Sequence, residues 1–169
     1  MKTPNIVVMG VAGCGKSSLG LALANALDAS YIEGDSYHPA ENIALMSAGI
    51  PLTDADRASW LERLAQRLAT GVAHGEAMVL ACSALKRRYR DTLRQGDPGL
   101  LFVHLAGSKA LIAERMTRRS AHFMPATLLD SQFHDLEEPA GDENHIRCDV
   151  SQPLDSLLQQ LLPQLTQNQ

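Results

Sequence analysis

Eight consecutive residues near the N-terminus have the types and spacing of a phosphate-binding loop. Residues 10–17 read GVAGCGKS, which fits the pattern G-x-x-x-x-G-K-[ST]. Glycines let the backbone turn tightly, so that successive N–H groups converge on phosphate oxygens. Lys16 is expected to reach the β- and γ-phosphates of a nucleotide, and the Ser17 hydroxyl to coordinate Mg²⁺. The alternative is an accidental glycine-rich turn, which the expected strand before the loop and helix after it argue against.

A nucleotide is expected to bind in this loop through its phosphates. The residues predicted to contact it are Gly10, Val11, Ala12, Gly13, Cys14, Gly15, Lys16, Ser17 and Ser18. No asparagine in the sequence is followed by lysine, so the Asn-Lys-x-Asp motif that GTPases use for guanine is absent. Cys14 is either an oxidation-sensitive thiol or a residue that only fills the loop.

A carboxylate that could act on a hydroxyl group of a substrate follows the second expected strand. Asp35 stands in the sequence Glu33-Gly34-Asp35, at the edge of the sheet where the phosphate loop also lies. It could accept a hydrogen bond from a substrate hydroxyl and help to hold Mg²⁺. A turn-forming Asp after Gly is the structural alternative.

The elements that must position these residues alternate along the chain. Strands are expected over residues 5–9, 29–33, 77–82, 100–105 and 146–150. Helices are expected over residues 17–27, 53–68, 86–94, 108–118 and 154–165. This alternation predicts an α/β fold of three layers, with a mainly parallel five-stranded sheet and helices on both faces.

Composition agrees with one enzyme-sized domain over residues 1–169. The chain is 45% apolar and 20% charged, with three cysteines that form no CxxC pair. No apolar run approaches the roughly 20 residues that span a bilayer, and the N-terminus lacks the features of a signal peptide. We therefore expect a cytoplasmic protein without a membrane partner.

The charge is unevenly distributed. The net charge is −4, yet residues 84–119 contain nine Lys or Arg against three Asp or Glu. A basic segment within an acidic small protein indicates an anionic small molecule rather than a nucleic acid.

Several ordered blocks outside the phosphate loop are similar to those of the gluconate kinases, within the P-loop kinase superfamily. These blocks are Glu33-Gly34-Asp35-Ser-Tyr-His38-Pro39 with Asn42, Met46 with Gly49-x-Pro51-Leu52, Asp54-x-Asp56-Arg57 with Trp60-Leu61, residues 82–91 (CSALKRRYRD), residues 122–125 (HFMP) and Leu128-Leu129-x-Ser131-Gln132-Phe133. The resemblance covers about residues 6–152. It departs from many relatives at Ala12 and Cys14, where they carry Ser.

The resemblance implies a reaction, cofactors and an assembly. It implies transfer of a phosphoryl group from ATP to D-gluconate, giving ADP and 6-phospho-D-gluconate, with Mg²⁺ and commonly as a homodimer. Arg57 and Arg90 would clamp the substrate carboxylate and Lys86 would add a point charge. Asp35 and His38 would address the hydroxyl groups.

Some of these residues have structural alternatives. His38 could be a turn residue before Pro39, and Arg57 could form a solvated salt bridge with Asp54 or Asp56. Lys86 and Arg90 share one face of a helix, which leaves Arg87 and Arg88 to solvent.

A lid is expected at about residues 119–139. Arg119 and Arg115 could each approach the transferring phosphoryl group and stabilise its charge, and the sequence does not decide between them. Arg119 is assigned as the catalytic residue and Arg115 as a nucleotide contact. The alternative is that the arginines at this helix end only complement the helix dipole.

Two other functions are compatible with the phosphate loop. One is another small-molecule kinase, acting on shikimate or a nucleoside monophosphate. The other is a nucleotide-dependent regulatory binding protein that hydrolyses ATP slowly.

The turn at residues 149–153, after the last expected strand, is the predicted adenine site.

Overall fold

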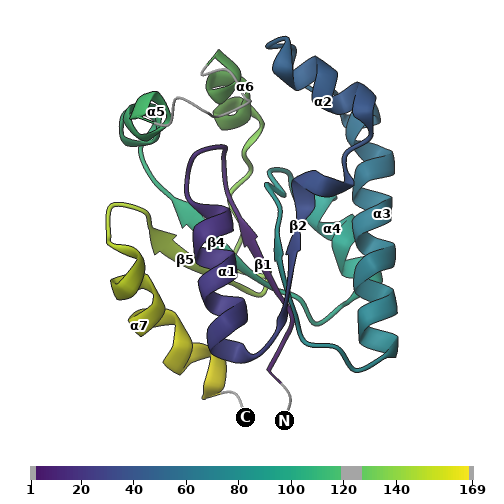
Figure 1. The fold of residues 1–169 in the computed structure, drawn as a ribbon, viewed down its shortest axis with the longest axis vertical. Coiled ribbons are helices and arrows are strands. Elements are labelled where there is room, and N and C mark those ends of the chain that lie inside the picture. Colours follow the sequence, from purple (N-terminus) through teal and green to yellow (C-terminus); the bar gives the residue numbers. More distant parts are fainter. Residues whose placement is uncertain (1–2, 119–126, 168–169) are drawn as a thin grey trace.

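Five parallel strands form a single sheet at the centre of the molecule (Figure 1). The computed structural model describes residues 3–118 and 127–167. The strands are β1 (Ile6–Met9), β2 (Ser30–Glu33), β3 (Met78–Ala81), β4 (Leu101–Ala106) and β5 (His145–Asp149). Their spatial order is β2-β3-β1-β4-β5, and every pairing is parallel. The first strand of the chain therefore lies in the middle of the sheet.

Apolar side chains on both faces explain why the central strands form. In β1, Val7 pairs with Leu80 of β3 on one side and with Phe102 of β4 on the other. All three side chains are fully buried. Strands covered on both faces are continuously apolar, as these are, because helices pack against each side of a parallel sheet.

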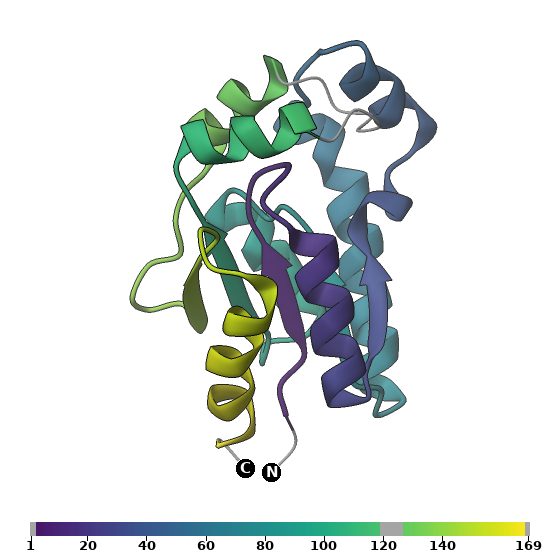
Figure 2. The same ribbon diagram turned by 60° about the vertical axis from the view of Figure 1, so that its left-hand side comes forward.

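Seven α-helices and one short 3-10 helix are described. They are α1 (Lys16–Leu27), η1 (Gly34–Tyr37), α2 (Ala40–Ser47), α3 (Asp54–Ala73), α4 (Arg87–Gly96), α5 (Lys109–Arg118), α6 (Thr127–Asp135) and α7 (Leu154–Thr166). Helices α1 and α7 cover one face of the sheet, and α3 and α4 cover the other (Figures 1 and 2). Helices α2, α5 and α6 lie beyond the carboxyl ends of the strands, at the end of the molecule opposite the two termini (Figure 2).

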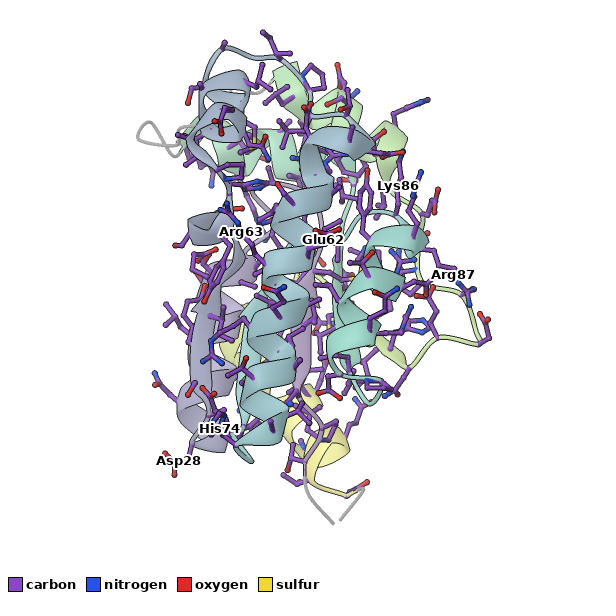
Figure 3. All side chains as sticks on the ribbon, turned by 90° about the vertical axis from the view of Figure 1, so that its right-hand side faces the viewer. Asp28, Glu62, Arg63, His74, Lys86 and Arg87 are labelled. Carbon is purple, nitrogen blue, oxygen red and sulfur yellow. The ribbon has the colours of Figure 1, made fainter. Side chains whose placement is uncertain are left out.

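Helix α3 shows how local sequence defines these elements. It starts with a capping box, in which the Asp56 N–H donates to the Thr53 hydroxyl and the Thr53 N–H donates to the Asp56 carboxylate. Trp60, Leu64 and Leu68 recur every four residues and are buried against the sheet. Glu62 and Arg63 lie on the opposite, solvent-facing side of the helix (Figure 3).

The expected fold is confirmed, and all ten expected strands and helices are present with bounds that differ by a few residues. The largest difference is at α3, which continues to Ala73 instead of ending near residue 68. The 3-10 helix η1 and the short helices α2 and α6 were not expected. Within the described residues, no helix is both long and apolar enough to cross a membrane.

Candidate active site

The loop between β1 and α1 has the backbone conformation that its glycines predict. Gly13 and Gly15 adopt φ angles of 80° and 99°, in the left-handed region that strains other residues. A Cβ on Gly13 would lie 2.6 Å from the Met116 side chain, so helix α5 packs closely against this loop. The Lys16 ammonium donates to the Val11 carbonyl at 3.0 Å, and α1 begins at Lys16. The loop thus presents its N–H groups, a lysine and a helix N-terminus in one place.

A cleft joins this loop to the segment that follows β2. It is lined by Ala12, Gly13, Gly15, Lys16, Ser17, Ser18, Glu33, Asp35, His38, Met46, Leu52, Arg57, Trp60, Ser83 and Gln132. The structure therefore brings most of the residues predicted for the nucleotide together with Asp35, His38 and Arg57. Ligands gather at this edge of open α/β sheets.

Oxygen groups suited to a cation lie at the base of the cleft. The Ser17 hydroxyl donates to the Glu33 carboxylate at 2.7 Å, and the Tyr31 hydroxyl donates to the same carboxylate. Burial, together with Glu33, raises the pKa of Tyr31, so this hydroxyl keeps its proton. Mg²⁺ in kinases takes one or two carboxylates and completes its shell with phosphate and water. A hydroxyl with the carboxylates of Glu33 and Asp35 fits that chemistry.

His38 is held as a neutral ring beside Trp60. The two rings stack with their centroids 4.0 Å apart, and the Trp60 indole N–H donates to the Gly34 carbonyl at 2.8 Å. Burial, with a further contribution from Arg57, lowers the pKa of His38 to about 4. The Asn42 amide nitrogen lies 3.2 Å from the His38 Nδ1. Because that amide nitrogen is a donor, Nδ1 accepts and the ring proton is on Nε2.

Arg57 is buried rather than solvated. Only 7% of it is exposed, and its Nη1 donates to the Tyr89 hydroxyl at 2.8 Å and to Asp135 of α6 at 3.3 Å. The Tyr89 hydroxyl in turn donates to Asp54. The alternative of a solvated salt bridge with Asp54 or Asp56 is therefore wrong, because a buried tyrosine and a residue of α6 hold the guanidinium at the cleft.

Lys86 lies beside this network but outside the cleft. It is the residue before α4, and its ammonium donates to Asp54 at 3.0 Å. Its contact with the cleft runs through Asp54 and Tyr89, because the lysine is not one of the cleft-lining residues in the described part of the chain. Lys86 and Arg87 are labelled at the start of α4 in Figure 3. Arg87 and Arg88 are exposed, as expected.

The structure contradicts the expectation that Arg90 clamps the substrate. Arg90 is fully buried, and its guanidinium donates to both oxygens of Glu143 and to the carbonyls of Ala84 and Leu85. The two carbonyls belong to the loop between β3 and α4, so Arg90 connects this loop with Glu143 in the interior of the protein. Because Lys86 precedes the helix, it does not share a helical face with Arg90, and the pair predicted from the spacing does not form.

The lid arginines are only partly described. Arg115 lies on α5 and is partly exposed. Hydrogen bonds from Ser151 lower the pKa of Asp149 at the end of β5, and the charges of Arg147 and Arg115 lower it further. Arg119, the predicted catalytic arginine, lies outside the described residues, as do residues 120–126 of the expected lid. Cys14 is buried in the loop.

Six of the residues that line the cleft were not assigned to the site from the sequence, and two of them, Glu33 and Gln132, form hydrogen bonds with the phosphate loop. The Glu33 carboxylate accepts a hydrogen bond from the Ser17 hydroxyl. Its place at the end of an expected strand, directly before Gly34-Asp35, could have indicated a role in the site. Gln132 accepts a hydrogen bond from the Ala12 N–H at 2.6 Å. No local signal indicates Gln132, because the two partners are 120 residues apart.

Comparisons with known proteins identify similar sequences and structures. Residues 12–153 match the family model described as shikimate kinase. The chain is 44% identical to the thermosensitive gluconokinase of Escherichia coli K12, over 95% of this chain and 86% of that protein. It is 46% identical to a gluconokinase of Gluconobacter oxydans, over 96% of this chain and 91% of the relative. The crystal structure of a gluconokinase from Sinorhizobium meliloti superimposes with a TM-score of 0.88 at 50% identity, covering 98% of this chain and 93% of that one.

Proposed function

The chain belongs to the gluconokinase family of P-loop kinases, and we propose that it transfers the γ-phosphoryl group of ATP to D-gluconate, forming ADP and 6-phospho-D-gluconate. One observation carries the proposal for the site. A single cleft contains a phosphate-binding loop on one side and a carboxylate, a neutral imidazole and a guanidinium on the other. Such a pair of half-sites is what transfer from a nucleotide to an acidic polyol requires.

The nucleotide half-site stabilises phosphate charge. The backbone N–H groups of Gly13, Gly15, Lys16 and Ser17, together with the Lys16 ammonium, would bind the β- and γ-phosphate oxygens. Lys16 would exchange its present bond with the Val11 carbonyl for phosphate oxygens. Ser17 and Asp35, with Glu33 behind them, would hold Mg²⁺, which when bound neutralises charge on the phosphate oxygens.

The acceptor half-site orients gluconate. The Arg57 guanidinium would bind the carboxylate of the substrate, because its planar donors suit two carboxylate oxygens. The His38 Nε2–H would donate to a hydroxyl group of the polyol chain. This arrangement leaves the opposite end of the substrate, its 6-hydroxyl, beside Asp35 and the phosphate loop.

Asp35 would act on the attacking hydroxyl. It would accept the hydrogen bond of the 6-hydroxyl and then its proton, as the bond from O6 to the γ-phosphorus forms. The bond between that phosphorus and the bridging oxygen of ADP breaks at the same time, and ADP leaves with the electron pair. Arg119, and Arg115 nearer the nucleotide, would stabilise the charge on the transferring group while a lid over residues 119–139 excludes water.

The experiment that tests this function is ADP release from purified protein with Mg-ATP, measured with and without D-gluconate. Shikimate and AMP run in parallel, since the family model that matches the chain is described as shikimate kinase. We expect stimulation by gluconate and 6-phosphogluconate as the product. If shikimate alone stimulates ADP release, shikimate and not gluconate is the acceptor. If the protein binds ATP but no acceptor stimulates ADP release, the result favours a regulatory binding protein.

We also propose that the enzyme works in the cytoplasm as a homodimer, with no nucleic-acid or membrane partner. The resemblance to the family supports the dimer, and the acidic net charge of −4 agrees with the absence of nucleic acid. Light scattering on the purified protein would give the mass of the assembly directly.

A further inference from the structure

Helix α6 contacts both halves of the cleft. One face of the helix presents Gln132, whose Oε1 accepts from the Ala12 N–H of the phosphate loop at 2.6 Å. One turn later, Asp135 pairs with Arg57 at 3.3 Å. Residues three apart on a helix lie on the same side, so the two contacts form together. This helix therefore connects the loop that binds the phosphates with the arginine expected to bind the acceptor.

Packing keeps α6 in register with the loop. Leu128, in its first turn, forms a small buried cluster with Ala12, Met46 and Leu52. After the helix, the Glu137 N–H donates to the Leu85 carbonyl at 2.8 Å. Each end of α6 is thus attached to a different part of the protein.

The Ala12 peptide lies where the donor and acceptor sides meet. Ala12 lines the cleft as part of the loop, and it also packs against Met46 and Leu52, which line the cleft from the acceptor side. A phosphoryl group in transit must occupy the space between the two sides. In the proposed reaction the γ-phosphate of ATP would extend into that space, where ADP has no group.

We propose that Gln132 is a positioning residue that couples α6 to the phosphate loop and favours binding of the triphosphate over the diphosphate. Its amide oxygen fixes the orientation of the Ala12 peptide, and with it the part of the loop that borders the γ-phosphate. Gln132 is only 8% exposed, so its rotamer is set by packing. If its amide oxygen were removed, the buried Ala12 N–H would lose this acceptor. The inference rests on the proposed function for the identity of the nucleotide.

The test compares the affinities for a non-hydrolysable ATP analogue and for ADP, both with Mg²⁺, by titration calorimetry. Gln132→Met keeps the length and burial of the side chain but removes the acceptor. We expect it to weaken binding of the analogue about tenfold, the effect of one hydrogen bond to a buried group, while ADP affinity changes less than about twofold. Equal losses for both nucleotides, or no loss for either, would overturn the proposal.

Two further variants make the result specific. Ser131→Ala changes the neighbouring residue, whose hydroxyl donates to the Leu128 carbonyl within the same helix, and it should leave both affinities unchanged. Gln132→Glu keeps an acceptor for Ala12 but places a negative charge at the cleft, so it should lower affinity for the analogue more than for ADP even if Gln132→Met does not fold. Unchanged discrimination in Gln132→Glu would contradict the assignment.

The titrations contain no acceptor, so their outcome does not depend on gluconate. If gluconate fails to stimulate ADP release, the proposed function falls while the role of Gln132 is still measured. If gluconate stimulates release but the nucleotide ratio does not move, only the role of Gln132 falls.

Discussion

Asp35 lies in η1, directly after β2, where the ends of the strands open into the cleft. In the proposed reaction it orients the acceptor hydroxyl and takes its proton. Proton transfer to a positioned general base accelerates a reaction about 10²–10⁴-fold. We expect Asp35→Asn to lower kcat/KM for gluconate by about that factor, and Lys16→Ala to lower it by a similar or larger factor.

A coupled assay of ADP formation measures this effect. Asp28→Asn is the matched control, because Asp28 is exposed at the end of the molecule opposite the cleft (Figure 3). Near-native rates from either cleft variant would remove that residue from the mechanism.

In the proposed reaction Arg57 binds the carboxylate of the acceptor. Arg57→Lys keeps the charge but loses the planar pair of donors, so KM for gluconate should rise about 10- to 100-fold, the loss expected for a charge-assisted hydrogen bond. KM for ATP should change little. Initial rates over a matrix of both substrates separate the two constants, with Arg63→Lys on the solvent face of α3 as control (Figure 3). An equal rise in both constants would contradict a role in acceptor binding.

Residue types near the strand ends were predictable from the sequence, but their partners were not. Lys16 and Ser17 were predicted from a motif of fixed spacing, and Asp35 because it follows the second strand at the same edge of the sheet; all three line one cleft. Arg90 was assigned to the substrate because its planar guanidinium suits a carboxylate and it was expected to share a helix face with Lys86. The sequence does not indicate its actual partner. That partner, Glu143, is 53 residues away and becomes adjacent only when β5 joins the sheet.

At the scale of elements, α4 is fastened to the segment before β5 by a buried ion pair. Burial alone would raise the pKa of Glu143, but hydrogen bonds from Arg90 and Arg94 lower it to about 2. Glu143→Gln leaves the Arg90 charge uncompensated in the interior. Breaking a buried pair in this way costs about 3–5 kcal/mol, so the free energy of unfolding should fall by that amount.

Urea denaturation monitored by circular dichroism gives this free energy. The control is Asp142→Asn, which weakens the neighbouring pair with Arg87, where both side chains are exposed. An exposed pair contributes at most about 1 kcal/mol. Similar losses from the two variants would show that burial is not what makes the Glu143 pair important.

Long periodic elements were predictable, whereas short ones were not. Helix α3 has a capping box and a regular apolar stripe, which are local signals. Helices α2 and α6 have eight and nine residues, too few to be stable on their own sequence. They form because Met46 and Leu128 pack together with Ala12 and Leu52, and such contacts across the chain leave no periodic pattern.

For the whole molecule, two buried histidines should make stability depend on pH. Burial lowers the pKa of His38 to about 4, and burial also lowers that of His104 to about 4, despite the nearby Glu138 carboxylate. Both rings bind protons more readily in the unfolded chain, whose histidine pKa is about 6.5. Their contribution is therefore complete above about pH 6.5 and is lost as the pH falls towards 4.

The expected loss between pH 7 and pH 4.5 is on the order of 2 kcal/mol for each histidine. Urea unfolding at several pH values measures it, and His104→Gln should make the dependence shallower over this range. His74→Gln, at an exposed position, should leave it unchanged (Figure 3). A free energy of unfolding that stays constant from pH 7 to 4.5 would contradict the prediction.

The central position of β1 has a consequence for folding during translation. Strand β1 (Ile6–Met9) is translated before its two neighbours, β3 and β4, which end at residues 81 and 106. Long loops must close before these strands pair, and such non-local contacts form slowly. The chain up to residue 106 must therefore emerge before β1 is flanked on both sides, and until then its apolar segment IVVM is exposed to binding by chaperones.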